Sequence, residues 1–368
     1  MIGAKLVRSP GLTGDHVRRL LEEAQGDPER ICEPEIVARA DLPLAARQFL
    51  LAPDEVALRA DLQWLRASGA RLLVWGDSEY PQPLAAIPGA PPALYVTGDA
   101  SVLKAPQLAL VGARRASPLG RVIARELAGA LTQAGLTITS GLAAGIDAAG
   151  HEGALSAGGP TVAVLGTGLD RIYPRENAGL AARIRAAGAL VSEFPPRTGP
   201  QRQHFPRRNR IISGLALGTL VIEAAERSGA LITAERALEQ GREVFAVPGS
   251  IRSPLSWGPH QLIRQGAHLV EGPADVLDAL QFNQGIQRLM STHGGPGEGL
   301  GQAPGTGAAL DKEYEMLLDA LGFEPATIDT LVARSGLSGE SIASMLLILE
   351  LEGRIAPYPG GLYGRLSR

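Results

Sequence analysis

The sequence predicts an α/β protein built around a doubly wound parallel sheet, with a helical domain before the sheet and a small winged-helix-like domain after it. Between residues 105 and 282, short runs rich in Val, Leu and Ile alternate with helical patterns. Strands buried on both faces of a parallel sheet have this near-continuous apolar character, and helices connect them. The Gly-rich stretch 283–309 is typical of a flexible linker. We therefore predict a helical domain over 1–75, the sheet domain over 76–282, the linker, and the last domain over 310–368.

The first part of the chain is expected to be helical. Periodic patterns with suitable start and stop residues predict the helices Gly14–Gln25, Pro34–Arg39, Leu44–Leu51 and Pro53–Ser68. The turn SPGLTG at 9–14 suits either ordinary helix packing or the phosphate-binding turn of a helix-hairpin-helix unit. Prolines across 79–106 exclude a regular helix there and leave room for one short strand, Ala93–Thr97.

The central sheet is predicted strand by strand. The apolar runs that predict strands are Leu108–Val111, Thr137–Ser140, Thr161–Leu165, Ala189–Glu193, Thr219–Glu223, Glu243–Val247 and His268–Val270. The helical patterns between them are Leu119–Ala134, Ala143–Ser156, Glu176–Ala187, Asn209–Ala216, Ala230–Gln240 and Gly258–Gln265. Right-handed crossovers bring the carboxyl ends of such strands to one edge of the sheet, where ligands bind.

The last domain has the element order of a winged helix. Its predicted helices are Glu313–Leu321, Thr327–Ser335 and Ser338–Glu352, and two short strands follow around Pro359-Gly360-Gly361. In a DNA-binding winged helix the recognition helix is basic. Here the third helix carries Glu340, Glu350 and Glu352 and neither Lys nor Arg. We therefore favour a structural or protein-contact role for this domain over DNA binding.

Composition excludes several classes of protein. No apolar run reaches the roughly 18 residues of a membrane span, and the first residues hold no signal-peptide core, so we expect a cytoplasmic protein without a membrane partner. The single cysteine, Cys32, excludes a disulfide framework and a cysteine zinc site. The sequence contains neither a GxxxxGK[S/T] phosphate loop nor a GxSxG nucleophile motif. We expect no metal, no cofactor, and binding rather than catalysis.

Charge is distributed unevenly along the chain. The net charge is −3, yet residues 105–282 hold 18 basic and 14 acidic residues, a net charge of +4, whereas 310–368 has a net charge of −4. A polyanion would therefore bind the sheet domain.

Three segments of the sheet domain place glycines at the ends of predicted strands, and the first and third of them add arginines. They are VGARRASPLG at 111–120, SGLAAGIDAAGHEGAL at 140–155 and LGTGLDRIYPREN at 165–177. Glycines let a backbone approach a phosphate closely, and helix N-termini favour anions. The candidate binding residues in these segments are Gly112, Ala113, Arg114, Arg115, Gly141, Gly145, Gly166 and Arg175.

Asp147 and His151 lie four residues apart in the second of these segments. On one helix face that spacing suits acid–base work or a metal, but no third ligand is near. We favour an Asp–His pair that fixes the loop.

The fourth segment, SEFPPRTGPQRQHFPRRNR at 192–210, is dominated by arginine. Residues 197–210 contain five arginines, His204 and Phe205 but no acidic residue. Arginines that follow phosphates, beside a ring that stacks on a base, are what binding of a single nucleic-acid strand requires. The candidate residues are Arg202, Phe205, Arg207, Arg208, Asn209 and Arg210. Ser228-Gly229 opens another predicted helix and offers a further phosphate site.

In their order along the chain, these motifs resemble the DprA/Smf family of bacterial DNA-processing proteins. The resemblance also covers the stretch from FPRRNRIISGLALGTLVIEAAERSGALITAERALEQGREVFAVPGS to SWGPHQLIRQGAHLV, and extends over about residues 75–282. It implies an extended Rossmann fold, a sterile-alpha-motif-like helical domain, binding of single-stranded DNA without strong sequence preference, and no enzymatic turnover. It further implies a homodimer that loads the recombinase RecA during natural transformation, and it leaves room for single-strand-binding protein as another partner.

The resemblance also assigns roles to individual residues. It implies that Arg114 or Arg115, Arg175, Arg202 and Phe205 line the strand-binding pocket. Ala113 stands where many members have Ser, so a side-chain contact to phosphate is lost there while the backbone contact is kept. The resemblance puts the dimer contact on 262–270, with Leu262, Ile263 and Leu269 as candidates and ordinary core packing as the alternative.

A function from another class remains open. Gly218-Thr219 with Glu223 resembles in outline the GGxGTxxE loop of nucleotide phosphoribohydrolases, which have a Rossmann-like core. In this sequence Leu215 and Ala216 replace the first glycines. We therefore favour the single-strand binder over a nucleotide-processing enzyme.

Overall fold

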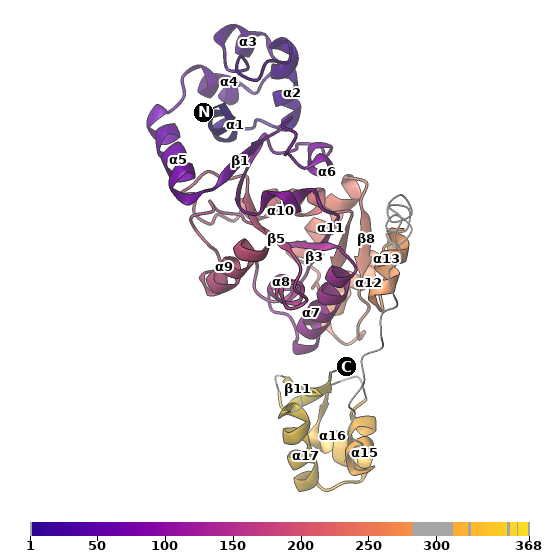
Figure 1. The fold of residues 1–368 in the computed structure, drawn as a ribbon. Helices are drawn as coiled ribbons and strands as arrows, with labels where there is room; N and C mark the ends of the chain where they lie inside the picture. The colour runs from indigo at the N-terminus through magenta and orange to yellow at the C-terminus, as the bar shows by residue number, and fades with distance from the viewer. Residues whose placement is uncertain (1, 282–311, 323–324, 352–353, 359, 367–368) are drawn as a thin grey trace, which may run out of the picture. The chain divides into compact units, whose positions relative to one another are not determined.

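The structure is a computed structural model that describes residues 2–281, 312–322, 325–351, 354–358 and 360–366. The predicted linker at 283–309 lies outside the described residues. The chain divides into two compact units, one containing most residues up to Leu280 and the other containing the C-terminal residues. Figure 1 shows both units.

Helices form the N-terminal part of the larger unit. They are α1 Ile2–Arg8, α2 Gly14–Glu23, α3 Pro34–Arg39, α4 Leu44–Leu51 and α5 Glu55–Ser68. Asp54 caps α5, where its side chain accepts hydrogen bonds from the N–H groups of Val56 and Ala57. Leu6, Val17 and Val37 belong to the fully buried core of these helices. The sequence predicted every helix of this group except α1.

Nine strands form the central sheet. They are β1 Arg71–Val74, β2 Ala93–Gly98, β3 Gln107–Val111, β4 Thr137–Ser140, β5 Thr161–Val164, β6 Ala189–Ser192, β7 Gly218–Val221, β8 Glu243–Ala246 and β9 His268–Leu269. Their order is β1-β2-β6-β5-β4-β3-β7-β8-β9. All neighbours from β6 to β9 are parallel, whereas β1 pairs antiparallel with β2 and β2 with β6. The sheet takes in residues 71–74, which the sequence had assigned to the helical domain.

Helices connect the strands and cover both faces of the sheet. They are α6 Gln82–Ala85, α7 Pro118–Gln133, α8 Ile146–Ser156, α9 Ala178–Ala187, α10 His204–Leu215, α11 Gly229–Glu239, α12 Trp257–Arg264 and α13 Pro273–Ala279, with short 3₁₀ helices at Ala100–Lys104, Arg175–Asn177 and Pro254–Ser256. Val162 and Val164 share a core cluster with residues of α10 and α11, while Ala163 between them packs with residues of α9. This alternation confirms the predicted α/β fold with a largely parallel sheet.

The chain reverses its direction across the sheet at β3. From β3 it moves through β4 and β5 to one side, and it later returns to β7 on the other side of β3 before reaching β8 and β9. The loops after β3 and β7 therefore diverge, which opens a crevice at the carboxyl edge of the sheet.

One predicted helix starts in the wrong place. The sequence predicted a start at Asn209, but α10 begins at His204. Pro206 and the run of arginines are typical of a loop, yet proline is tolerated in the first turn of a helix because the N–H it lacks has no partner there. The longer helix determines where Phe205 and Arg208 lie.

The smaller unit is a winged helix, as predicted. It contains α15 Lys312–Leu321, α16 Ile328–Ser335 and α17 Gly339–Leu351, with β10 Ala326–Thr327, β11 Ile355–Tyr358 and β12 Leu362–Arg365. The three strands form a sheet in the order β10-β12-β11, and β10 was not predicted. Leu331, Ile342 and Leu346 lie in its core, whereas Leu347 and Ile348 are exposed on α17.

In the part of the chain that the structure describes, no helix is long and apolar enough to cross a membrane. Nor does that part of the chain hold a group of three or more His, Cys, Asp or Glu side chains suited to a metal ion.

Candidate functional site

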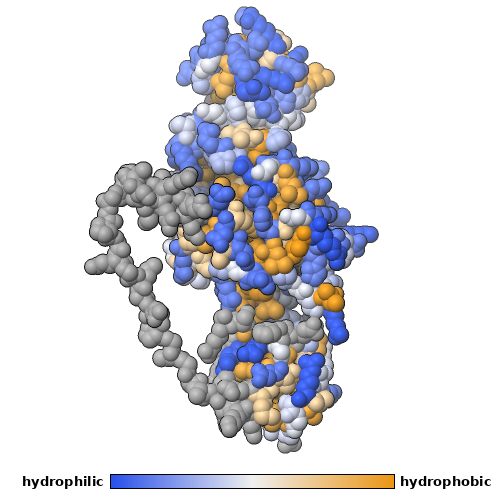
Figure 2. All heavy atoms as spheres, turned by 90° about the vertical axis from the view of Figure 1, so that its right-hand side faces the viewer, coloured by the Kyte–Doolittle hydropathy of each residue, from blue (hydrophilic) through white to orange (hydrophobic). Residues whose placement is uncertain are grey.

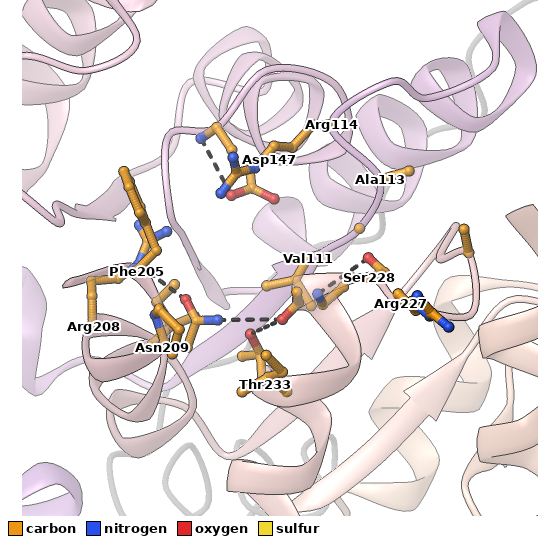
Figure 3. A pocket seen from close by; sticks show the side chains of 18 of the residues that line it. Val111, Ala113, Arg114, Asp147, Phe205, Arg208, Asn209, Arg227, Ser228 and Thr233 are labelled. Carbon is orange, nitrogen blue, oxygen red and sulfur yellow. Dashed lines mark hydrogen bonds between the residues drawn. The ribbon is translucent and has the colours of Figure 1, made fainter. Parts of the chain in front are cut away.

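A cavity of about 770 Å³ lies in the crevice between the β3 and β7 loops. Its walls come from the loops after β3, β4, β5 and β7, and from α10 and α11. The charged side chains that line it are Arg114, Arg115, Arg202, Arg208, Arg227 and Asp147. Figure 3 shows Phe205 and Arg208 on one side of the opening and Arg227 with Ser228 on another. Five arginines against one carboxylate make the cavity strongly electropositive.

Glycines let the β3 loop pack closely against the loop before α8. A Cβ at Gly112 would lie 2.6 Å from the side chain of Ile146. Gly145 has a φ of 84°, and a Cβ there would overlap the carbonyl of Ala113. These two predicted site residues therefore hold the loops together, while Arg114 and Arg115 extend from the same turn into solvent.

Arg208 forms the floor of the cavity. Only 4% of it is exposed, and its Nη1 donates hydrogen bonds to the carbonyls of Gly141, at 2.7 Å, and Val164. Its Nε donates to Oδ1 of Asn209 at 3.1 Å. Burial lowers the pKa of Arg208 to about 10, although the charge of Asp147 opposes this shift. A Cβ at Gly141 would overlap the guanidinium, so Gly141 provides the space that Arg208 occupies.

Asp147 and His151 do not form the predicted pair. Oδ2 of Asp147 accepts hydrogen bonds from the N–H groups of Gly141, at 3.1 Å, and Ala143, at 3.3 Å. His151 is fully buried one turn further along α8, where its Nδ1 lies 2.7 Å from Oγ1 of Thr161. The prediction was wrong because both side chains point to separate partners; Asp147 alone fixes the loop. Burial raises the pKa of Asp147 and lowers that of His151 to about 3.

Two aromatic rings and a guanidinium gather at the rim. The guanidinium of Arg114 lies 5.3 Å from the centre of the Phe205 ring. The ring of Tyr173 lies 5.7 Å from that of Phe205, tilted by 47°. The backbone of Gly166 is also against Phe205, because a Cβ there would lie 3.1 Å from Cδ1 of the ring. Sequence reasoning missed Tyr173, although an aromatic residue within the LGTGLDRIYPREN segment was a usable signal.

Two of the predicted arginines are held by a carboxylate. Arg207 lies 3.1 Å from Oε2 of the buried Glu193, and Arg210 binds the same oxygen. Residues 197–210 lack an acidic residue, but Glu193 comes from the end of β6 and supplies the countercharge. Burial also lowers the pKa of Arg210. Two of the five arginines of this segment are therefore paired with a carboxylate, although the segment itself holds no acidic residue. Neither Arg207 nor Arg210 lines the cavity.

The predicted binding residues fall into two groups, those that line the cavity and those that do not. Those that line the cavity are Gly112, Ala113, Arg114, Arg115, Arg202, Phe205, Arg208 and Asn209. Those outside its lining are Gly141, Gly145, Gly166, Arg175, Arg207 and Arg210. Arg175 is exposed in a short 3₁₀ helix just after the rim loop.

The start of α11 forms the opposite wall. Ser228 caps this helix and accepts a hydrogen bond from the N–H of Ala230. Asn209 Nδ2 and Thr233 Oγ1 both donate to the carbonyl of Gly229, each at 3.3 Å, and the bond from Asn209 ties α10 to α11. The N-terminus of α11 therefore lies beside Arg227 on the cavity wall, where backbone N–H groups favour an anion.

The fold and this cavity define a Rossmann-like α/β protein with a basic, aromatic-rimmed pocket at the point where the strand order reverses. The family model for DNA recombination-mediator protein A matches residues 71–281, and the model for the DprA winged helix domain matches residues 301–361. The chain belongs to the DNA recombination-mediator protein A family, also called DprA or Smf.

Several relatives are similar over most of their length. Protein Smf of Escherichia coli is 45% identical over 324 residues, which cover 88% of this chain and 84% of that protein. DNA processing protein DprA of Bacillus subtilis is 43% identical over 216 residues, which cover 58% of this chain and 73% of that protein.

Two solved structures share the fold. DprA from Streptococcus pneumoniae has a TM-score of 0.65 and 39% identity, covering 74% of this chain and 95% of that one. DNA processing protein A from Helicobacter pylori, whose structure was described for its single-stranded DNA binding mode, has a TM-score of 0.53 and 26% identity, covering 58% of this chain and 96% of that one.

Proposed function

We propose that this protein binds single-stranded DNA in the basic pocket and acts on DNA in the cytoplasm as a recombination mediator during natural transformation. The observation that carries the proposal is the cavity itself, with five arginines and one carboxylate in its lining and aromatic rings at its rim. Family membership supports the same reading, as does the single-stranded DNA binding described for the Helicobacter pylori protein.

The chemistry of the pocket suits a strand rather than a duplex. Arg114, Arg115 and Arg202 are exposed at the cavity and able to follow a flexible backbone of phosphates. Aromatic rings offer stacking surfaces to unpaired bases, which a duplex keeps inside its own stack. Because phosphate contacts release counterions, affinity falls steeply as salt increases.

Titration of labelled oligo-dT at several salt concentrations tests this function. We expect tight binding at low salt that weakens linearly on a log–log plot, and a slope smaller by about 0.7 for Arg114→Ala, since one phosphate contact is lost. Arg185→Ala, on α9 at the opposite edge of the sheet, serves as the control and should keep the slope. Absence of binding at low salt would refute the proposal, and release of free base from nucleoside monophosphates would instead favour the enzyme.

A homodimer formed across β9 is part of the proposal. β9 is an edge strand, and Leu269 on it is 45% exposed. Leu238, Leu262 and Ala267 line a small groove of about 80 Å³ beside it. Figure 2 shows apolar side chains on the face toward which α12 and α13 lie in Figure 1. Of the three predicted contact residues, Leu262 is buried in the core and Ile263 packs against it, so Leu269 offers the exposed surface.

Loading of RecA is the further step that we propose from family membership. A strand held in the pocket of a dimer would be presented to RecA while its phosphates remain partly covered, with single-strand-binding protein as the competitor to be displaced. The test measures RecA filament growth on oligo-dT that is already coated with single-strand-binding protein. This protein should shorten the lag before growth, and the Arg114→Ala variant should do so less effectively.

A further inference from the structure

We propose that the outer face of α5, together with the exposed side of α4, is a docking site for an acidic segment of a partner protein that also carries apolar residues. The site lies in the helical group before the sheet and shares no residue with the lining of the basic pocket. It goes beyond the proposed binding of DNA, because it gives a separate task to the helices that the pocket does not use.

Three large apolar side chains are exposed where α4 leads into α5 (Figure 1). Leu44 is 69% exposed, Leu51 is 48% exposed and Val56 is 74% exposed. The other large apolar side chains of α1 to α5 are buried or half-buried. One exposed apolar residue is ordinary, but several on neighbouring elements mark a surface that another molecule covers.

The same face of α5 continues from Val56 with positive charge. Residues 56, 59, 63 and 66 are spaced to share one side of a helix. A recess of about 500 Å³ on this side is lined by Arg59, Leu62, Gln63, Arg66 and Ala67. Two arginines around a leucine offer paired donors for carboxylates beside an apolar contact.

The two arginines of the recess have no carboxylate partner among the described residues. Arg59 Nε donates to the backbone carbonyl of Glu55 at 3.2 Å, and neither Arg59 nor Arg66 forms an ion pair with a carboxylate in the part of the chain that the structure describes. Three arginines in and after α2 do lie beside carboxylates, namely Arg18, Arg19 and Arg30. The charges of the recess are therefore available to a carboxylate from outside.

The inner side of α5 is fixed, so its outer face is presented in one arrangement. Asp61 accepts hydrogen bonds from Arg8 Nε at 2.6 Å and from Arg8 Nη2 at 2.8 Å, which joins α5 to α1. The Trp64 ring packs edge-on against Tyr95 of β2, with 6.3 Å between the ring centres. Order that exists before binding reduces the entropy that docking costs.

The surroundings favour a short acidic segment over a nucleic acid. Residues 1–70 contain 9 basic and 11 acidic residues, so a long polyanion would be repelled beyond the two arginines. Arg59 and Arg66 are separated by about 10 Å along the helix axis, a distance that about three residues of an extended chain span. The segment that fits has acidic residues three positions apart, with apolar residues between them.

The test uses fluorescence anisotropy of the full-length protein with three labelled peptides, in the presence of saturating unlabelled oligo-dT so that the pocket is filled. The acidic apolar probe is four repeats of Asp-Leu-Ser. In one control peptide lysine replaces aspartate, and in the other serine replaces leucine. We expect the probe to bind and both controls to bind about tenfold more weakly, because each lacks one of the two kinds of contact.

Variants locate the bound probe. Arg59→Glu combined with Arg66→Glu should weaken probe binding at least about tenfold, since repulsion replaces two attractions. Val56→Ser should weaken it by a smaller factor. Arg39→Glu, at an exposed arginine of α3 outside the recess, is the matched control and should keep full binding.

Oligo-dT binding, measured without the peptides, separates this site from the pocket. The double variant should bind oligo-dT as the unchanged protein does, which also shows that the larger unit is still folded. If the probe binds only when oligo-dT is left out, it occupies the basic pocket and the inference is wrong. If the double variant loses oligo-dT but circular dichroism shows a retained fold, α5 belongs to the DNA surface instead. If the probe does not bind at all while oligo-dT does, the recess takes no acidic segment and the proposed function still stands.

Discussion

At the scale of single residues, Arg208 places a charge where the sequence suggested only a basic surface. Its guanidinium is bonded to two backbone carbonyls and to Asn209, and it lies under the loop that begins at Gly141. A buried charge is tolerated when its hydrogen bonds are satisfied and an opposite charge is near. Here Asp147 provides that charge, and the electric field of Arg208 still reaches the cavity above.

Gly141→Ala should destabilise the protein by about 1–3 kcal/mol, the usual cost of overpacking. The added Cβ would overlap the guanidinium of Arg208, so either the loop or the arginine must move. Urea unfolding measures the loss, and oligo-dT binding should weaken in parallel. Gly199→Ala is the matched control, because nothing lies within 4 Å of its Cβ position. Equal stability of the two variants would show that the floor is not tightly packed.

His151 should make stability depend on pH. Burial holds the pKa of His151 at about 3, below the ordinary value of 6.5. Between pH 3 and pH 6.5 the unfolded chain therefore binds a proton at His151 that the folded protein does not bind. The contribution of the neutral, buried His151 to stability is complete above pH 6.5 and is lost as the pH falls toward 3. The loss approaches about 1.4 kcal/mol per pH unit. The raised pKa of Asp147 acts in the opposite direction.

His151→Phe isolates this contribution, because Asp147 is present in both proteins and its effect cancels. Urea unfolding at pH values from 7 down to 4 should show the unchanged protein losing stability faster than the variant. Parallel pH profiles would mean that His151 takes up a proton in the folded state as readily as in the unfolded chain.

At the scale of elements, the strands were the most predictable part of the fold. Strands buried on both faces have to be almost wholly apolar, and each predicted strand from β3 to β8 lies within two residues of its observed bounds. The exposed edge strand β9 was predicted equally well. β1 was missed because it is short and mostly half-exposed, and its antiparallel pairing with β2 has no local signature.

The site was harder to predict because its residues meet through the fold. The sequence located the loops, the arginines and Phe205, since these follow predicted strands. It could not predict the ion pair between Glu193 and Arg210, which are 17 residues apart in the chain. Nor could it predict that Arg208 donates to the carbonyl of Gly141, 67 residues away. Tyr173 was missed because its place at the rim, beside the Phe205 ring, depends on where α10 puts Phe205.

The edge strand β9 leads to a prediction about assembly. Leu269→Glu should convert the proposed dimer into a monomer, because it puts a charge on exposed apolar surface that a second copy would have to bury. Multi-angle light scattering at micromolar concentration gives the mass. Ile251→Glu, at an exposed apolar residue that belongs to neither β9 nor the groove, is the control. If the unchanged protein shows only the 38.4 kDa species, the dimer does not form.

At the scale of the whole molecule, the two units differ in their suitability for DNA. The pocket belongs entirely to the larger unit. In the winged helix, α17 carries no Lys or Arg and exposes Leu347 and Ile348, a surface better suited to protein than to phosphate. We therefore keep the prediction, made from the charge of this domain, that the winged helix does not bind DNA.

Removal of every residue after Phe282 should leave single-strand affinity nearly unchanged. Residues 310–368 have a net charge of −4, so repulsion from phosphates outweighs any fit of the winged helix to a groove. The truncated and full-length proteins are compared on oligo-dT in matched salt, with dimer mass checked for both. A loss of more than about tenfold in a folded, dimeric truncation would mean that the winged helix holds the strand.

The way Arg208 reaches beneath Gly141 also has a consequence for synthesis on the ribosome. The glycine loops after β3, β4 and β5 emerge first, but the residue that fills the space beneath them arrives with α10, and the opposite wall arrives later still with α11. Because domains fold as units while the chain grows, the pocket is incomplete until translation has passed both helices. A nascent chain therefore completes the pocket, and with it the proposed site for a DNA strand, only after more than half of the chain has been made.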